Sequence, residues 1–286
     1  MKMTLIFHSL RKASFSLIWA LTLATGVKAD NMKILRVGTR DNACSTTEIF
    51  AFGGSMLSIR LDYTAAAGTR IAWTNDLFLI SSSMAAPFEK LPPLARVVEE
   101  GGTHVLWLPD VRVPEVKQRT EMLLKILGQA EGNESVCANI KLFVYPLDMA
   151  KPLKELVSGG LRLAVFGKSE AIRTFLRANK IAFTELGDEI PVRVDCGLFV
   201  TGDIDSRKLD DWLKHLPKGE GVRLVAFTRD PWSIPGVYVQ AQPGSMICKV
   251  TLPILEKLTS DPRSQAAFIE LFSQSISVFT LPAQSL

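Results

Sequence analysis

The stretch that decides the fold is residues 161–179, LRLAVFGKSEAIRTFLRAN. Its first six residues form a short apolar run, which is typical of a buried strand. A Gly-Lys-Ser turn follows, and residues 170–179 then place their apolar side chains at helical spacing. A strand, a tight turn and an amphipathic helix together form the repeating unit of an α/β fold.

The same alternation continues on both sides of this stretch. Strands alternating with helices predict a parallel sheet covered on both faces, with right-handed crossovers. We therefore expect a three-layer α/β domain over residues 140–286. The predicted strands are 140–145, 161–166, 181–184, 196–201, 222–227 and 236–239, and the predicted helices are 151–157, 170–179, 206–216, 251–259 and 262–275.

Residues 30–139 have a different period. Residues 58–63, SIRLDY, alternate polar and apolar side chains, as a half-buried strand does. Short apolar runs recur between Gly-Gly and Pro-Pro turns, which is typical of a β-sandwich. We predict an all-β sandwich domain over 30–139, and the two domains join without a flexible linker. The predicted strands are 33–37, 49–52, 56–63, 70–73, 77–80, 104–108 and 121–127.

The first 29 residues have the pattern of a secretory signal peptide. Lys2, Arg11 and Lys12 precede an uncharged apolar run, and Val27-Lys28-Ala29 gives small residues at the cleavage positions. The run is about half the length that spans a bilayer. We expect cleavage before Asp30, export to the periplasm or the extracellular space, and no membrane association afterwards. An uncleaved membrane anchor is the alternative.

Removal of this segment changes the charge of the protein. The whole chain has 33 basic and 29 acidic residues, but four of the basic residues and none of the acidic ones lie within 1–29. The remaining chain of about 257 residues is balanced, with 29 of each sign. Nucleic-acid binding requires a basic patch. We therefore expect no nucleic-acid partner.

Four cysteines remain after cleavage: Cys44, Cys137, Cys196 and Cys248. Export permits disulfides, and three connectivities are possible. Cys44–Cys137 and Cys196–Cys248 would each stay within one domain. Their spacings match neither a small disulfide scaffold nor a metal site, so four buried free thiols are the favoured alternative.

Polar residues gather where the predicted strands of the α/β domain end. In an open parallel sheet, ligands bind beyond the carboxyl ends of the strands. Trp232 could stack on a hydroxyl-rich ligand, whereas Ser169 and Asp205 could equally cap helices. A surface ion pair and a packed indole are the plain alternatives for the other candidates. The ligand-binding candidates are Asp148, Lys168, Ser169, Asp203, Asp205, Arg229, Asp230 and Trp232.

Sharper catalytic motifs are incomplete or missing. Gly167-Lys168-Ser169 resembles the end of a phosphate-binding loop, but Arg162 stands where the first glycine should be. The chain has no Gly-x-Ser-x-Gly nucleophile elbow. His104 and His215 fall in different predicted domains, so neither a metal site nor a cofactor site is expected.

Four segments in residues 70–146 resemble a pattern in large bacterial proteins similar to glycoside hydrolase family 2. The segments are Arg70-Ile71-Ala72-Trp73, Leu91-Pro92-Pro93-Leu94, Val105-Leu106-Trp107-Leu108-Pro109-Asp110-Val111 and Lys141-Leu142-Phe143-Val144-Tyr145-Pro146. The resemblance implies an immunoglobulin-like sandwich followed by a domain like class I glutamine amidotransferases, with a flavodoxin-like sheet. The usual tryptophan before the last of these strands is absent, and Asn139 or Ile140 stands there.

The catalytic barrel of those enzymes has no room in this chain, so the resemblance implies an accessory pair of domains. Our first hypothesis is an exported accessory protein without catalytic activity, associated with carbohydrate binding or processing. The second is a glycosidase-like hydrolase that uses the carboxylates of Asp203, Asp205 or Asp230. The third is an interaction module of a larger hydrolase, which would dock through an exposed apolar patch.

Overall fold

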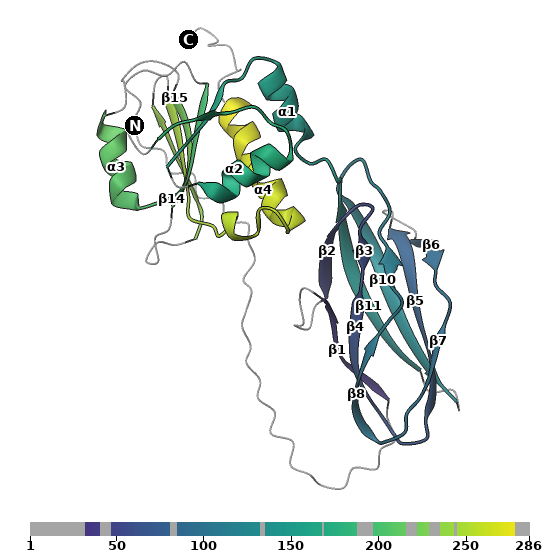
Figure 1. Ribbon diagram of the computed structural model, residues 1–286. Coiled ribbons are helices and arrows are strands. Elements are labelled where there is room, and N and C mark those ends of the chain that lie inside the picture. Colours follow the sequence, from purple (N-terminus) through teal and green to yellow (C-terminus); the bar gives the residue numbers. More distant parts are fainter. Residues whose placement is uncertain are drawn as a thin grey trace, which may run out of the picture. The chain divides into compact units, whose positions relative to one another are not determined.

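The chain divides into two compact units, one ending at Leu147 and one beginning at Asp148 (Figure 1). Each unit is described by itself. The predicted signal peptide, residues 1–29, lies outside the described residues. The computed structural model describes residues 32–40, 47–80, 85–131, 135–167, 169–187, 197–215, 222–228, 235–242 and 245–277.

The first unit is built from two sheets, and we call it the two-sheet unit. The smaller sheet is antiparallel, in the order β1 (Lys33–Thr39), β4 (Ile59–Ala65) and β8 (Gly102–Trp107). The larger sheet has six strands: β2 (Glu48–Phe52), β11 (Ser135–Tyr145), β10 (Thr120–Ala130), β5 (Arg70–Ile80) and β6 (Ala85–Lys90) in that order, with β7 (Leu94–Val97) also paired to β5. A short ribbon joins β3 (Met56–Leu57) to β9 (Val111–Arg112).

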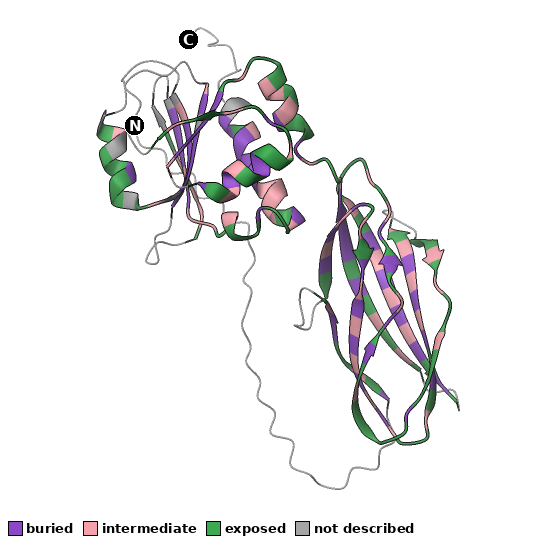
Figure 2. Cartoon of the chain, in the orientation of Figure 1, coloured by how far each residue is buried: buried purple, intermediate pink, exposed green. Residues whose placement is uncertain are grey.

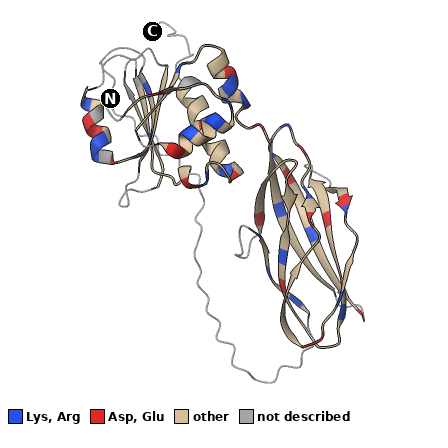
Figure 3. Ribbon diagram, viewed as in Figure 1, with Lys and Arg blue, Asp and Glu red and all other residues tan. Residues whose placement is uncertain are grey.

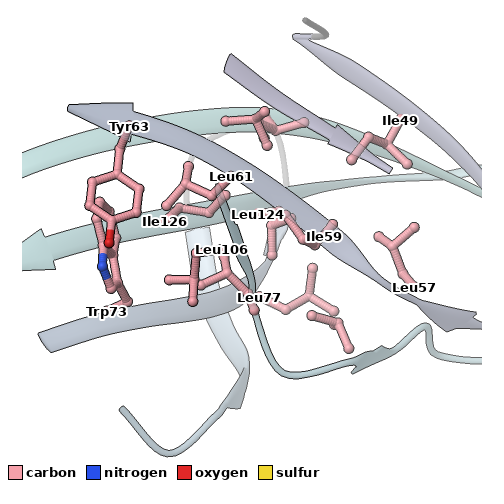
Figure 4. Packing of buried hydrophobic residues seen from close by; sticks show 14 of the residues in the cluster. Ile49, Leu57, Ile59, Leu61, Tyr63, Trp73, Leu77, Leu106, Leu124 and Ile126 are labelled. Carbon is pink, nitrogen blue, oxygen red and sulfur yellow. The ribbon is translucent and has the colours of Figure 1, made fainter. Parts of the chain in front are cut away.

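One hydrophobic core fills the space between these sheets. Along β4, Ile59, Leu61 and Tyr63 are buried and alternate with less buried residues, as the period of a strand requires (Figure 2). Figure 4 shows these side chains beside Trp73 of β5 and Ile126 of β10. Inward side chains of both sheets therefore share one core, which is the packing of two facing sheets.

The sequence predicts most strands of this unit, with two kinds of error. Residues 70–73 and 77–80 belong to one continuous strand, β5, and the edge strands β6 and β7 were not predicted. Residues 140–145 were assigned to the α/β domain, and this is wrong. They form the second half of β11, which pairs with β10 and β2 in the larger sheet, so the units divide at 147/148 rather than 139/140.

The second unit, which we call the mixed unit, contains a sheet of six strands. All neighbours are parallel except β16, which is antiparallel to β17. The strand order is β13 (Thr184–Glu185), β12 (Leu163–Phe166), β14 (Leu198–Ile204), β15 (Val222–Thr228), β17 (Ser245–Val250) and β16 (Val237–Gln242).

Helices cover both faces of this sheet. Leu163 and Val165 of β12 pack in one cluster with buried residues of α1 (Lys151–Ser158), α2 (Glu170–Ala178) and α4 (Pro262–Ser277). Ala164 and Phe166 point to the other face, where Leu209 of α3 (Ser206–His215) is buried. Figure 1 shows α3 on one side of the strands and the other three helices on the opposite side.

One predicted helix of the mixed unit is wrong. Residues 251–259 contain only a short 3-10 turn, η1 (Leu255–Lys257), and the strand β17 before it was not predicted. Its five-residue run Met246–Val250 includes Lys249, and Gly244 precedes it, so neither strand nor helix periodicity stands out. No helix among the described residues has the length and apolar character needed to cross a bilayer.

Candidate functional site

The sheet of the mixed unit changes direction between β12 and β14. From β12 the chain passes through α2 to β13 on one side, and β14 then pairs with the other side of β12. Such a reversal is a topological switch point, where the carboxyl ends of neighbouring parallel strands leave room for a ligand. We call the carboxyl ends of β12, β14 and the next parallel strand, β15, the carboxyl edge.

Ser169 ties β12 and β14 together at the carboxyl edge. Its side chain is 1% exposed, and its Oγ donates to the Phe166 carbonyl oxygen at 3.0 Å. The Gly202 backbone N–H donates to the same Oγ at 2.6 Å. We predicted Ser169 either as a ligand-binding residue or as a helix cap. The cap reading is wrong, because its side chain makes no capping hydrogen bond to α2.

Gly167 makes the turn that leads out of β12. Its φ of 68° lies in the left-handed region, which favours glycine. Arg173, one turn into α2, fixes this loop because its Nη2 donates to the Gly167 carbonyl oxygen at 2.6 Å. A Cβ atom on Gly167 would lie 3.3 Å from Oγ1 of Thr201, so this hydroxyl faces the turn.

Two threonine hydroxyls are buried without a hydrogen bond, one in the middle of β14 opposite the last residue of β12 and one at the end of β15. Thr201 of β14 is 1% exposed and Thr228 of β15 is 7% exposed, and neither Oγ1 atom has a partner within the part of the chain that is described. In the sheet, Thr201 lies opposite Phe166 of β12 and Ala226 of β15, and Thr228 comes two residues after Ala226 on the same strand. Both threonines therefore belong to the face of the sheet that α3 covers. Sequence reasoning missed them, although each ends an apolar strand run.

Asp205 acts as a helix cap. Its Oδ1 accepts a hydrogen bond of 2.7 Å from the backbone N–H of Arg207 in the first turn of α3, and its carbonyl oxygen accepts from Leu209. This is the N-cap arrangement, so the capping alternative for Asp205 is confirmed. In contrast, Ser169 at the start of α2 makes no side-chain capping hydrogen bond to the first-turn amides of the helix, which have no partner within the helix itself.

The remaining candidates are not brought together by the described structure. Asp148 follows β11, which is a strand of the two-sheet unit, and its exposed carboxylate pairs with Nζ of Lys154 at 2.8 Å. The prediction that Asp148 follows a strand of the parallel sheet is therefore wrong. Asp203 lies in β14, and its side chain is outside the described set. Lys168, Arg229, Asp230 and Trp232 also lie outside the described residues.

The charged residues that are described do not separate by sign. Figure 3 shows Lys and Arg interspersed with Asp and Glu along helices and strands of both units. On α2, for example, Arg177 contacts the carboxylates of Glu170 and Glu185. Among the described residues at the carboxyl edge, Ser169, Thr201 and Thr228 contribute neutral hydroxyls, and Arg173 contributes a guanidinium that bonds to the Gly167 carbonyl oxygen.

Two of the four cysteines can be placed, and both are free thiols. Cys248 is buried in β17, where its Sγ lies 3.6 Å from Oγ of Ser275 and burial raises the pKa of the thiol. Cys137 is exposed on β11, so the prediction of four buried thiols is wrong at this position. Cys44 and Cys196 lie outside the described residues.

Comparisons with known proteins give no family. No family model and no curated protein matches the chain. Among solved structures, it is similar to a Niemann-Pick type C2 protein from Japanese carpenter ant, with 10% identity, a TM-score of 0.32 and coverage of 41% of this chain and 94% of that one. It is also similar to the periplasmic chaperone SfaE, with 12% identity, a TM-score of 0.27 and coverage of 45% of this chain and 65% of that one. A β-glucosidase from Listeria innocua is similar with 11% identity, a TM-score of 0.27 and coverage of 41% of this chain and 16% of that one. Similarities at these TM-scores identify neither a fold family nor a function.

Proposed function

We propose that this chain is an exported accessory protein without catalytic activity, which binds a hydroxyl-rich ligand at the carboxyl edge of the mixed unit. The ligand class we propose is carbohydrate. The observation that carries this proposal is a pair of buried, unpartnered hydroxyls: that of Thr201 in β14, which lies opposite the last residue of β12, and that of Thr228 at the end of β15.

An unpaired buried hydroxyl is costly to the folded protein. Leaving such a group without a hydrogen bond costs about 1–3 kcal/mol, and the described residues provide no partner for either threonine. A sugar hydroxyl both donates and accepts, as a threonine hydroxyl does, so it satisfies these groups without adding charge. The first-turn amides of α2, which the Ser169 side chain does not cap, supply further donors at the same edge.

Asp205 argues against the hydrolase alternative. Glycoside hydrolysis needs a pair of carboxylates that flank the scissile bond. The Asp205 carboxylate is engaged at the start of α3, where it accepts the Arg207 N–H. The hydroxyl of Ser169 is likewise occupied, since it donates to Phe166 and accepts from Gly202. Both groups therefore support structure at this edge, which favours a binding role over a catalytic one.

The finer fold assignment belongs to the same proposal. The order β13-β12-β14-β15 is the 2-1-3-4 order of the flavodoxin-like doubly wound fold, and this supports an amidotransferase-like assignment for the mixed unit. For the two-sheet unit, the facing sheets support an immunoglobulin-like sandwich. On this view the pair corresponds to accessory domains of glycoside hydrolase family 2-like proteins, and a partner hydrolase remains an expected associate.

Titration calorimetry tests the binding proposal. The whole protein is titrated with a panel of neutral monosaccharides and oligosaccharides, beside the variants Thr201→Val and Thr120→Val. We expect the wild type to bind at least one sugar and Thr201→Val to bind it at least about tenfold more weakly, because one hydrogen bond to the ligand is lost. Thr120 is a matched control, since its Oγ1 already donates to the Gln118 carbonyl oxygen in the two-sheet unit.

The same variant separates a binding role from a structural one. Thr201→Val removes an unpaired hydroxyl at constant shape, so its free energy of unfolding should match the wild type or rise by about 1 kcal/mol. Weaker binding without loss of stability supports the proposal. If no sugar in the panel binds, the carbohydrate assignment fails; unchanged affinity in Thr201→Val would remove the carboxyl edge as the site.

Export has its own test. The positively charged start and the apolar run of residues 1–29 support cleavage before Asp30. N-terminal sequencing of protein recovered from the cell exterior or periplasm should begin at Asp30. Recovery of a chain that begins at Met1 in the membrane fraction would instead support the uncleaved anchor.

A further inference from the structure

The strand β8 forms an edge of the smaller sheet in the two-sheet unit. It pairs with β4 on one side, and no described strand pairs with its other side. Two large apolar residues on it point to solvent: Val105 is 55% exposed and Trp107 is 47% exposed. An exposed apolar edge strand is a template for pairing with another strand.

The register fixes which main-chain groups of β8 are unpaired. The Leu108 N–H donates to the Ile59 carbonyl oxygen at 2.9 Å, just beyond the last residue of the strand. Hydrogen-bonded pairs alternate along an antiparallel ladder, so Leu106 and His104 also bond to β4. Thr103, Val105 and Trp107 therefore direct their N–H and C=O groups away from the sheet.

This edge lacks the protection that two other edge strands of the unit, β1 and β6, have. Natural edge strands carry charges, prolines or bulges that discourage pairing. β1 has Lys33, Arg36 and a register shift, and β6 has Pro87 and a register shift in its pairing. β8 contains no charged residue or proline, and its pairing with β4 is unbroken from Gly102 to Trp107.

We propose that β8 is a self-pairing interface, at which two copies of this chain join antiparallel about Val105. In this register Val105 lies opposite Val105 of the second copy, and Thr103 lies opposite Trp107. The Val105–Val105 pair and the two symmetry-related Thr103–Trp107 pairs would exchange the main-chain hydrogen bonds that each β8 leaves open. The N–H and C=O groups of these residues all point toward the second copy, so the pairs occupy hydrogen-bonded positions of the ladder. The contact is isologous and closes on itself, so it gives a dimer and not a filament.

The side chains around this seam fit a second copy of the same strand. No charge would face a like charge across the two-fold axis, because Thr103, Val105 and Trp107 are all uncharged. On the neighbouring strand β4, Arg60 lies opposite Trp107 and Asp62 lies opposite Val105. These two charged side chains form an ion pair of 2.9 Å, so their charges neutralise each other beside the proposed interface. The pairing would join two three-stranded sheets into one continuous sheet.

The length of the seam limits its strength. Pro109 follows the strand and Gly101-Gly102 precede it, so pairing is confined to residues 103–107. Stable interfaces bury about 1,200–2,000 Å² in total, which is more than a five-residue edge provides. We therefore expect a weak, reversible dimer that forms with rising protein concentration.

Sedimentation velocity of the whole protein over a range of concentrations tests this interface. The variant Val105→Lys places two ammonium groups opposite each other at the two-fold axis and should raise the dimer dissociation constant by at least about tenfold. The matched control is Val97→Lys, since Val97 is 61% exposed on β7 of the other sheet. The control should dimerise as the wild type does, and the melting temperatures of both variants check that they fold.

Cross-linking tests the register. Under mild oxidation, Val105→Cys should give a disulfide-linked dimer and Val97→Cys should not exceed the wild type, which has the same native cysteines. A wild type that stays monomeric at all concentrations would overturn the proposal. Equal weakening by Val105→Lys and Val97→Lys, or a failure of Val105→Cys to cross-link, would also do so.

Discussion

At the scale of single residues, the indole ring of Trp73 packs directly against Gly128 in the two-sheet unit. The two residues are directly opposite each other on β10 and β5. A Cβ atom on Gly128 would lie 2.4 Å from the indole ring, so only glycine leaves room for this buried side chain. The indole thus covers the glycine of the neighbouring strand, which helps to fix the register of the pair.

We predict that Gly128→Ala destabilises the two-sheet unit by at least about 1–3 kcal/mol, because the added methyl group overlaps a rigid buried ring. Equilibrium unfolding in urea measures this. Gly187→Ala is the control: a Cβ there meets nothing within 4 Å, and the change should stay within about 0.5 kcal/mol. If Gly128→Ala were as stable as the wild type, the packing described for Trp73 would be wrong.

Some residues of the carboxyl edge could be predicted from the sequence and others could not. Asp205 was foreseeable as a helix cap, because a small polar residue between a strand and a helix often has that role, whereas the same reasoning was wrong for the side chain of Ser169. Thr201 and Thr228 were not foreseeable, since a threonine at the end of an apolar strand run is common. Their importance comes from being buried without partners, and this depends on how the strands and helices of the unit pack together rather than on the local sequence.

At the scale of elements, local pattern predicts best where one strand or helix carries its own signal. α2 and β12 were predicted within a few residues, because their periodicity is complete within one segment. β6 was missed because Pro87 and polar neighbours suppress the strand signal, although an edge strand tolerates proline. The end of β11 was assigned to the wrong unit because an apolar strand gives no indication of which sheet it joins.

The start of α4 makes stability depend on pH. Oδ1 of Asp261 accepts the Arg263 backbone N–H at 2.8 Å, and Oδ2 accepts from Nη2 of the same residue at 2.7 Å. Burial by itself raises the pKa of Asp261. The hydrogen bonds and positive charge of Arg263, together with the positive charge of Lys257, lower this pKa by more than burial raises it, so the net shift is downward. A lowered pKa stabilises the folded state above the unfolded value, and this contribution is lost as pH falls through the folded pKa.

We therefore predict that the free energy of unfolding of the wild type decreases as pH is lowered below about 4, in part through Asp261. Asp261→Asn should lose about 1 kcal/mol at pH 7, because a charged hydrogen bond becomes a neutral one, and should show a shallower decrease in acid. Urea unfolding of both proteins between pH 7 and pH 3 measures this difference. Parallel pH profiles would show that Asp261 is not a source of the acid dependence.

At the scale of the whole molecule, the two units have separate hydrophobic cores. The core of the two-sheet unit ends at Val144, and that of the mixed unit begins at Ala150. The change of period in the sequence predicted two domains. It could not locate their boundary, since residues 140–145 of β11 form a short, mainly apolar run of the same kind as β12.

We predict that residues 32–147 fold alone, because a unit with its own core does not need the rest of the chain. Circular dichroism of this fragment should give a strand spectrum and one cooperative thermal transition, which should match a transition of the whole protein. A fragment without cooperative unfolding would contradict the division at Leu147.

The central claim is that a hydroxyl-rich ligand binds at the carboxyl edge of the mixed unit, beside Thr201 of β14 and Thr228 of β15. The most direct measurement is an NMR titration of the whole protein with threonine methyl groups labelled, using the sugars that bind in calorimetry. The account predicts that the methyl signals of Thr201 and Thr228 shift on saturation, while those of Thr74 and Thr120 in the two-sheet unit stay in place. Saturation with no shift at Thr201 and Thr228, or with shifts confined to the two-sheet unit, would contradict it.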